Sequence, residues 1–147
     1  MKRITEKKKS ALIVLVAVTS MLMAACNNGL DIKQMYSFYL EIMPVPKRII
    51  QGETVEIRCR IVKEGNYSGT KYYIRYFQPD GKGELRLDDG RVFTPNDLFQ
   101  LDKDVFRLYY TSQCTDQQNI DIFLEDTFGQ VVKMTLSFGN ESKEKEV

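Results

Sequence analysis

The residue with the clearest chemistry in this sequence is Cys26, because a basic and then apolar leader and two small side chains precede it. The stretch from Leu22 to Cys26 reads Leu-Met-Ala-Ala-Cys and resembles a bacterial lipobox, although Met23 stands where such boxes usually have Leu. In a lipobox the cysteine is acylated on sulfur and becomes the new N-terminus after cleavage. The apolar run is shorter than the ~20 residues of a membrane-spanning helix. We therefore predict a cleaved signal peptide over 1–25 and lipid attachment at Cys26.

The alternative for this segment is an ordinary secreted protein that is cut near Ala25. An acylated cysteine with two or more chains would hold the protein stably on a membrane. The residues that follow it are polar, so we expect a lipidated tether over 26–35. They form no acidic cluster, which favours the periplasmic face. The predicted location is the bacterial cell envelope, on the outer membrane facing the periplasm.

The rest of the chain offers little that could catalyse a reaction. It contains no histidine, so it has no imidazole base, no serine–histidine or cysteine–histidine pair and no histidine metal ligand. Four carboxylates could suggest a calcium site, but their spacing fits no ligand loop and is typical of turns around a short strand: Asp80, Glu84, Asp88 and Asp89. We predict no catalytic residue, no metal and no cofactor.

Two further cysteines, Cys59 and Cys114, leave two interpretations open. An oxidising compartment and an even count allow a disulfide, and the spacing invites comparison with the bridge of immunoglobulin domains. However, the chain has no tryptophan to pack on such a bridge, and Cys114 follows a predicted strand rather than lying within one. Two separate thiols, with Cys59 buried, are the favoured interpretation.

The charge balance excludes a typical nucleic-acid-binding protein. The leader takes five basic residues and one acidic residue with it, which leaves 16 basic and 19 acidic residues and a net charge of −3. Nucleic-acid-binding domains instead show a basic surplus or stripe. The remaining length suits one domain with a single core.

Apolar residues alternate with polar ones along most of this domain, which indicates β-strands. Turn signals separate the alternating runs at intervals of about ten residues, the pattern of an antiparallel β-sandwich. We predict an all-β, immunoglobulin-like sandwich of about seven strands over 36–140 and a disordered charged tail over 141–147. The segment 85–104 is expected to be mostly loop, and the first strand, which precedes Pro44, an edge strand. The predicted strands are 36–43, 54–63, 71–77, 84–87, 105–112, 119–125 and 131–138.

The third predicted strand carries aromatic residues on both faces, so one set must point away from the core. Tyrosine, phenylalanine and arginine are enriched at protein-interaction surfaces. The candidate partner surface consists of Tyr73, Arg75, Phe77 and Tyr109. The alternative is that loop residues cover this face: Phe93, Leu98 or Phe99.

Three phrases within Met43–Gln130 are unusual enough to be specific, namely Gly-Thr-Lys-Tyr-Tyr at 69–73, Arg-Tyr-Phe-Gln-Pro-Asp-Gly at 75–81 and Cys-Thr-Asp-Gln-Gln at 114–118. Through them the chain resembles the TraQ family of conjugal transfer proteins from conjugative transposons. The resemblance implies a small lipoprotein of a transfer operon with an immunoglobulin-like sandwich and no established enzymatic activity. It also implies that Cys59 and Cys114 fall at family positions, and it brings no catalytic residues.

The sequence thus predicts a non-enzymatic, lipid-anchored accessory or assembly component of a conjugative DNA-transfer apparatus. Its expected partners are other envelope proteins of that apparatus and, through Cys26, the membrane, with no direct contact to nucleic acid. Two alternatives remain, a surface glycan-binding lipoprotein and an envelope hydrolase that uses carboxylates alone.

Overall fold

The computed structural model describes residues 4, 6–10, 13 and 35–141. The chain divides into two units, Met1–Lys33 and Gln34–Val147. In the first unit, residues 6–10 are helical, and no helix among the residues that the structure describes is long and apolar enough to cross a membrane. The predicted lipid attachment site Cys26, nearly all of the leader and tether, and the tail over 142–147 lie outside the described residues.

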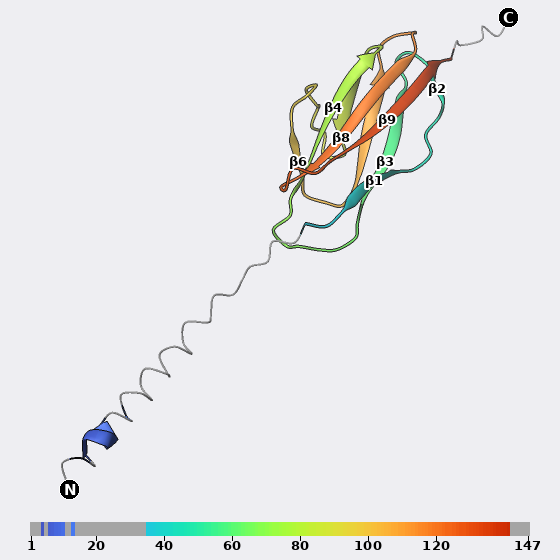
Figure 1. The fold of residues 1–147 in the computed structure, drawn as a ribbon. Coiled ribbons are helices and arrows are strands. Elements are labelled where there is room, and N and C mark those ends of the chain that lie inside the picture. The colour runs from blue at the N-terminus through green and yellow to red at the C-terminus, as the bar shows by residue number, and fades with distance from the viewer. Residues whose placement is uncertain (1–3, 5, 11–12, 14–34, 142–147) are drawn as a thin grey trace, which may run out of the picture. The chain divides into compact units, whose positions relative to one another are not determined.

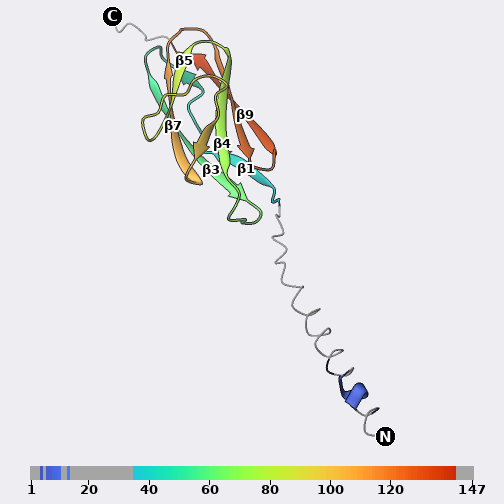
Figure 2. The same ribbon diagram turned by 90° about the vertical axis from the view of Figure 1, so that its left-hand side faces the viewer.

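The second unit is built from β-strands alone in its described part, residues 35–141, and they form two sheets (Figures 1 and 2). One sheet has four strands in the order β1-β3-β7-β5, and the other has five in the order β2-β9-β8-β4-β6. The strands are β1 Phe38–Ile42, β2 Arg48–Ile49, β3 Thr54–Lys63, β4 Tyr72–Asp80, β5 Gly83–Leu87, β6 Phe99–Leu101, β7 Val105–Ser112, β8 Gln118–Asp126 and β9 Val131–Asn140.

The alternation of apolar residues places one face of each long strand between the two sheets. In β3 the side chains of Val55, Ile57, Cys59 and Ile61 are buried while those between them are exposed. The facing sheet contributes fully buried residues from β4 and β8, among them Ile74. Because both sheets alternate in this way, the core is a single apolar layer between them.

All seven predicted strands are present, so the all-β prediction is confirmed, and two short strands are added to it. β2 lies in the connection that follows the first strand, and β6 lies in the segment that was expected to be mostly loop. β4 also runs on through Pro79 to Asp80, with a register shift between Phe77 and Asp80 in its pairing with β8. A shift of this kind accommodates a proline, which has no N–H to donate.

The segment around Pro44 carries the chain from one sheet to the other. β1 is the edge strand of the first sheet, as predicted, and pairs antiparallel with β3. After the two prolines, β2 pairs parallel with the end of β9 in the second sheet, where Ile49 is fully buried. The segment from β1 to β2 therefore forms backbone hydrogen bonds in both sheets.

The order of the seven predicted strands matches that of immunoglobulin domains, and the short strands β2 and β6 are added at the two edges of the second sheet. The order β1-β3-β7-β5 corresponds to strands A-B-E-D, and β9-β8-β4 corresponds to G-F-C. In variable-type domains the extra strands that extend the G-F-C sheet follow C directly. Here the extending strand β6 comes later in the chain, after β5 has already paired in the other sheet.

Candidate partner surface

The predicted surface residues of β4 lie on the outward face of the second sheet. Tyr73 and Arg75 are half-buried and Phe77 is exposed, whereas the alternate residues Tyr72, Ile74 and Tyr76 are buried in the core. In the register with β8, Tyr73 lies opposite Glu125, Arg75 opposite Phe123 and Phe77 opposite Asp121. On the other side of β8, Lys133 of β9 lies opposite Phe123 and Thr135 lies opposite Asp121. We call these eight residues the β4–β8–β9 face: Tyr73, Arg75, Phe77, Asp121, Phe123, Glu125, Lys133 and Thr135.

Arg75 is held at the centre of this face by residues of the protein itself. Its Nε lies 2.6 Å from Oε1 of Glu125, and both side chains are less than a third exposed. Its guanidinium carbon lies 4.4 Å from the centre of the Phe123 ring, within the range of a cation–π contact. Arg75 therefore positions Phe123 and Glu125 and is not a free cation.

Lys133 flanks the same ring from β9. Its Nζ lies 5.5 Å from the Phe123 ring centre and 2.9 Å from Oδ2 of Asp121. The Thr135 hydroxyl donates a hydrogen bond of 2.6 Å to Oδ1 of Asp121. The Thr135 hydrogen bond, with help from Lys133, lowers the pKa of Asp121 although burial acts in the opposite direction.

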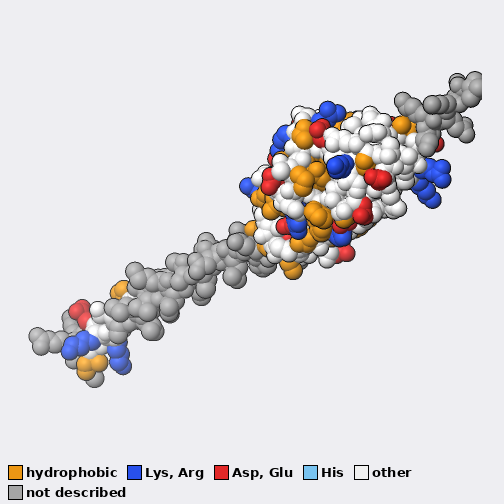
Figure 3. Space-filling view, turned by 90° about the horizontal axis from the view of Figure 1, so that it is seen from above, with side chains coloured by type: hydrophobic (Ala, Val, Ile, Leu, Met, Phe, Trp, Pro, Cys, Tyr) orange, Lys and Arg blue, Asp and Glu red, His pale blue; other side chains and the backbone are white. Residues whose placement is uncertain are grey.

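The charges of the β4–β8–β9 face balance, since two cations pair with two carboxylates. What remains for a partner is aromatic and apolar. Phe77 is 42% exposed, and Val131 beside Lys133 is 51% exposed. Figure 3 views the domain from above, and apolar and charged side chains are interspersed on the side that it shows. A charge-balanced, partly apolar face such as the β4–β8–β9 face suits a protein partner that contributes apolar contacts, and it offers no strong field to a highly charged ligand.

Tyr109 does not join this face. It lies on the outer side of the first sheet, opposite Glu56 of β3 and Arg86 of β5, with the Arg86 guanidinium carbon 5.7 Å from its ring centre. The sequence prediction that grouped it with the β4 residues therefore needs correction. Strand periodicity shows that Tyr109 points outward but not from which sheet.

The loop residues do not cover the β4–β8–β9 face. The ring of Phe93 lies 6.2 Å from that of Tyr76 and 4.5 Å from that of Phe99, on the inner side of β4. Leu98 is 54% exposed. The residues that sequence reasoning missed are those of β8 and β9. Their alternation is visible in the sequence, but the pairing that brings them beside β4 is not.

Cys59 and Cys114 are separate thiols in the structure, which contradicts the alternative of a disulfide between them. Cys59 lies opposite Phe106 in the β3–β7 pair, and its Sγ donates to the Ile57 carbonyl at 3.7 Å. Burial raises the pKa of its thiol to about 12. Cys114 lies beyond the end of β7, where its Sγ accepts a hydrogen bond of 3.1 Å from the Lys82 N–H.

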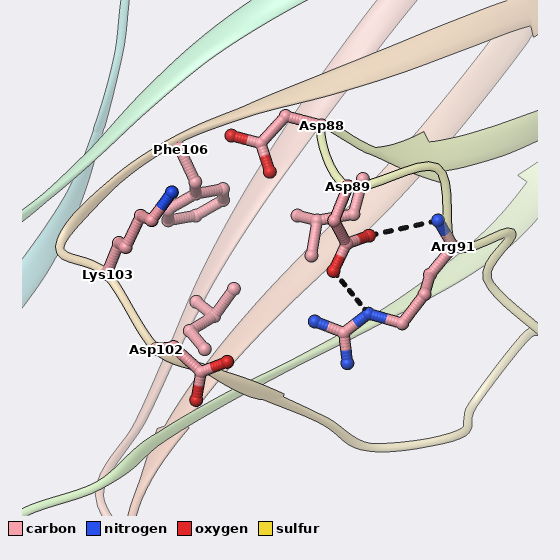
Figure 4. A pocket seen from close by; sticks show the side chains of 8 residues that line it. Asp88, Asp89, Arg91, Asp102, Lys103 and Phe106 are labelled. Carbon is pink, nitrogen blue, oxygen red and sulfur yellow. Dashed lines mark hydrogen bonds and ion pairs between the residues drawn. The ribbon is translucent and has the colours of Figure 1, made fainter.

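The four carboxylates considered for calcium do not come together. Asp80 accepts a hydrogen bond from Asn119 at 2.6 Å, and Asp88 and Asp89 line a separate pocket of about 170 Å³ (Figure 4). There the Arg91 side chain and backbone N–H lie 2.6 and 2.9 Å from the Asp89 carboxylate, which lowers the pKa of Asp89. Among the residues that the structure describes, no three histidine, cysteine or acidic side chains could hold a metal.

Comparison with known proteins gives this geometry a context. The family described as TraQ conjugal transfer protein matches residues 9–141. No curated protein matches the sequence. A crystal structure of a conjugative transposon lipoprotein from Bacteroides eggerthii shares 45% identity, covering 72% of this chain and 100% of its own, with a TM-score of 0.68.

Two structures solved by NMR are similar to the same degree. A lipoprotein from Bacteroides thetaiotaomicron shares 53% identity over 82% of this chain and 94% of its own, with a TM-score of 0.67. A conjugate transposon protein from Bacteroides vulgatus shares 48% identity over 81% and 97%, with a TM-score of 0.65. The family match over most of the chain and these solved relatives agree with the resemblance seen in the sequence, and the protein belongs to the TraQ family of conjugal transfer proteins.

Proposed function

We propose that this protein is a lipid-anchored accessory or assembly subunit of a conjugative DNA-transfer apparatus, which acts by protein–protein contact and not by catalysis. The observation that carries the proposal is the family match over residues 9–141. Solved relatives described as lipoproteins support the anchor, and one of them is described as a conjugative transposon lipoprotein.

The anchor is assigned to Cys26, at the end of the predicted leader. Two or more acyl chains on this residue would keep the protein on the outer membrane, facing the periplasm. From Cys26 to Tyr36 a fully extended tether would span at most about 35 Å. Confinement within this distance raises the effective concentration of the domain near envelope partners.

The contact is assigned to two aromatic side chains of the β4–β8–β9 face, exposed Phe77 and half-buried Tyr73. Phe77 and Tyr73 flank the network in which Arg75 and Lys133 are already neutralised. A partner could cover these rings without stripping water from an unpaired charge, which keeps the cost of binding low. The net charge of −3 after leader removal agrees with a protein partner and not with nucleic acid.

The first experiment is an in-cell crosslink and pull-down of the full-length lipoprotein from a donor strain, with Cys26→Ala as the control. We expect the wild type to recover subunits of the transfer channel and the Cys26→Ala variant to lose them and leave the membrane fraction. Recovery of glycan or of general envelope proteins alone would contradict the proposal and favour the glycan-binding alternative.

The second experiment locates the contact by measuring transfer frequency. Removal of a central aromatic contact costs ~2 kcal/mol of binding free energy, about a 30-fold loss of affinity. We therefore expect Tyr73→Ala and Phe77→Asp to reduce both transfer and partner recovery. Tyr109→Ala is the matched control, since Tyr109 is an outward tyrosine of the opposite sheet. Equal transfer by all three variants would exclude the β4–β8–β9 face as the contact.

A further inference from the structure

Two arginines lie directly opposite each other on the outer side of the first sheet. Arg58 of β3 pairs with Arg107 of β7 in the strand register. The Arg58 carbonyl accepts a hydrogen bond of 3.0 Å from the Met43 N–H, so the backbone groups of Arg58 point toward β1 and not toward β7. Arg58 and Arg107 therefore form a non-hydrogen-bonded pair, in which the side chains lie closest. Like charges in such a pair repel each other and destabilise a sheet.

The two arginines share one carboxylate. Oε1 of Glu56 lies 2.8 Å from Nε of Arg58 and 3.4 Å from Nε of Arg107. The Arg58 hydrogen bond is the main cause that lowers the pKa of Glu56, and the charge of Arg107 contributes less. Each guanidinium has five N–H groups, so a single carboxylate leaves most of these donors to water. One positive charge is therefore in excess at this pair.

This excess is a local feature of the domain. In each of the other ion pairs among the residues that the structure describes, one cation meets one carboxylate, namely Arg60 with Glu41, Lys63 with Asp104, Arg75 with Glu125, Arg91 with Asp89 and Lys133 with Asp121. The net charge of the chain is −3 after leader removal, so a general surplus of cations does not explain the arrangement.

A groove of about 360 Å³ lies beside the arginine pair. It crosses the first sheet between two rows of outward side chains, which the spacing along a strand separates by about 7 Å. Cys59 and Phe106 also line the groove, and because their side chains are buried in the core, their backbone forms its floor. We call the six residues of the two rows the arginine groove: Glu41, Arg60 and Val105 in one row, and Met43, Arg58 and Arg107 in the other.

The walls of the arginine groove combine unsatisfied cations with apolar surface. The side chains of Arg58 and Arg107 are 67% and 56% exposed. Met43 and Val105 are 51% and 64% exposed. Arginine forks match a carboxylate in a bidentate geometry, and clusters of arginine recognise acidic segments of proteins. The charge and the apolar walls are therefore complementary to a segment that carries both carboxylates and apolar side chains.

A lipid surface or a free phosphate fits this groove less well. Attraction to anionic headgroups needs several unpaired cations near the membrane. The outward face of the first sheet instead mixes three glutamates with four arginines, namely Glu41, Glu56 and Glu84 with Arg58, Arg60, Arg86 and Arg107. A free phosphate would bind the two arginines but would leave Met43 and Val105 uncovered.

We propose that the arginine groove binds an acidic segment of another protein, with a carboxylate between the guanidinium groups of Arg58 and Arg107 and apolar side chains against Met43 and Val105. The carboxylate would neutralise the excess charge and relieve the repulsion of the arginine pair. Because Glu56 already restrains Arg58, little side-chain freedom would be lost on binding. The inference goes beyond the proposed function, since this groove lies on the opposite sheet from the β4–β8–β9 face.

The test is an NMR titration of the full-length protein in an uncharged detergent. The probe is a short peptide in which glutamate alternates with leucine, and the readout is the signals of the arginine Nε–H groups. We expect the signals of Arg58 and Arg107 to shift. Those of Arg75 and Arg91, each paired with a carboxylate of its own, should stay unchanged. The same peptide with glutamine in place of glutamate should shift none of them.

Arg107→Gln should weaken binding of the peptide about tenfold or more, the usual effect of losing a hydrogen bond between charged groups. Arg86→Gln is the matched control, because Arg86 is an outward arginine of the same sheet that lies over Tyr109 and does not line the groove. Arg107→Gln removes a repulsion and should fold at least as well as the wild type. Arg58→Gln serves as a second variant if Arg107→Gln does not fold.

Unchanged signals of Arg58 and Arg107 would overturn the proposal, and so would equal binding of the peptide by Arg107→Gln and the wild type. Inorganic phosphate that binds as tightly as the peptide would overturn it too, because the groove would then recognise any anion. Binding to phosphatidylglycerol vesicles that Arg107→Gln abolishes would assign the groove to a membrane instead. Because the titration requires neither the anchor nor the transfer apparatus, its failure leaves the pull-down result unaffected.

Discussion

The buried hydroxyl of Tyr110 connects polar groups that lie at one end of the core. It donates to Oε1 of Gln118 at 2.6 Å and accepts from Nε2 of Gln78 at 2.8 Å. Gln118 in turn donates to the Ser112 hydroxyl at 2.9 Å, and that hydroxyl donates to the Cys114 carbonyl at 3.0 Å. Because every member has a partner, the network can be buried without a large penalty.

Replacement of Tyr110 by Phe should therefore destabilise the protein. The change leaves the Gln118 carbonyl oxygen without its donor inside the core, where Gln118 is fully buried. We expect a loss of about 1–3 kcal/mol in the free energy of unfolding, measured by urea denaturation. Tyr109→Phe, at the next position but on the outer side, should change it by less than about 0.5 kcal/mol. Equal effects of the two changes would contradict this account.

Asp121 should make stability depend on acid. The pKa of its carboxyl is lowered from 3.8 in the folded protein, mainly by the Thr135 hydrogen bond. As the pH falls, the unfolded chain takes up this proton first, so the stabilisation is complete above about pH 4 and is lost below it. Asp121→Asn should cost about 1 kcal/mol at pH 7. The difference from wild type should shrink as the pH falls from 4 to 2.

Urea denaturation across this pH range checks the prediction, with Asp116→Asn as the control. Asp116 is exposed and forms no side-chain hydrogen bond or ion pair within residues 35–141. A difference between Asp121→Asn and wild type that stays constant from pH 7 to pH 2 would show that the carboxylate charge does not contribute.

For individual residues, the sequence predicted on which face of its strand a side chain lies better than it predicted which other side chains would contact it. Period-two alternation placed Tyr73 and Phe77 outward and Ile74 inward, because a strand has only two faces. It could not show that Arg75 stacks on Phe123, since that contact depends on which strands pair. The burial of Gln118 is not expected for a polar side chain. It is explained by the hydrogen bonds that Gln118 forms with Tyr110 and Ser112, which the sequence alone does not reveal.

Among the elements, the β8–β9 turn is fixed by one side chain. Oδ1 of Asp126 accepts hydrogen bonds from the backbone N–H groups of Phe128 and Gln130, at 2.9 and 2.8 Å. Its Oδ2 accepts a third, of 2.7 Å, from the Gln130 amide. That amide also donates to the Tyr36 carbonyl at 3.0 Å, so the turn holds the start of β1 as well.

Asp126→Ala should therefore loosen two elements at once. We expect a loss of about 1–3 kcal/mol in the free energy of unfolding, because the partly buried N–H groups of Phe128 and Gln130 lose their acceptor. Faster amide hydrogen exchange should appear at Phe128 and Gln130 and at the start of β1. Asp126→Asn keeps a carbonyl acceptor and should lose less. Unchanged exchange at the start of β1 would show that Gln130 does not couple the two elements.

The elements that the sequence failed to predict are the two shortest. β2 has two residues and β6 has three, which is too few for a period of two to be visible. Both form because a longer strand offers an edge to them, β9 to β2 and β4 to β6. The longer strands were predictable because their own alternation defines a buried face, as in Thr54–Lys63.

For the molecule as a whole, the reactivity of Cys59 and that of Cys114 toward a thiol reagent should depend on different motions of the domain. Cys59 lies in the core between the sheets, and burial raises its pKa to about 12, so little thiolate exists in the folded state. Cys114 lines an open pocket outside the strands. We expect a thiol reagent to label Cys114 in the native protein and Cys59 only on global unfolding. The Cys114→Ser variant isolates the Cys59 rate, which should fall as stability rises. Native-state labelling of Cys59 as fast as that of Cys114 would exclude this packing.

The way the chain enters the sandwich also determines how it would bear mechanical load. β1 begins beside Gln130, at the start of β9, and the last strand ends beside β2 at the other end of the domain (Figure 1). A pull between Met35 and Glu141 would act along the strands and not across them. The β1–β3 hydrogen bonds would then carry the force in parallel and yield together, instead of opening one after another. If the domain is held at its N-terminus and pulled at Glu141, the β1–β3 hydrogen bonds would therefore resist the force in shear geometry.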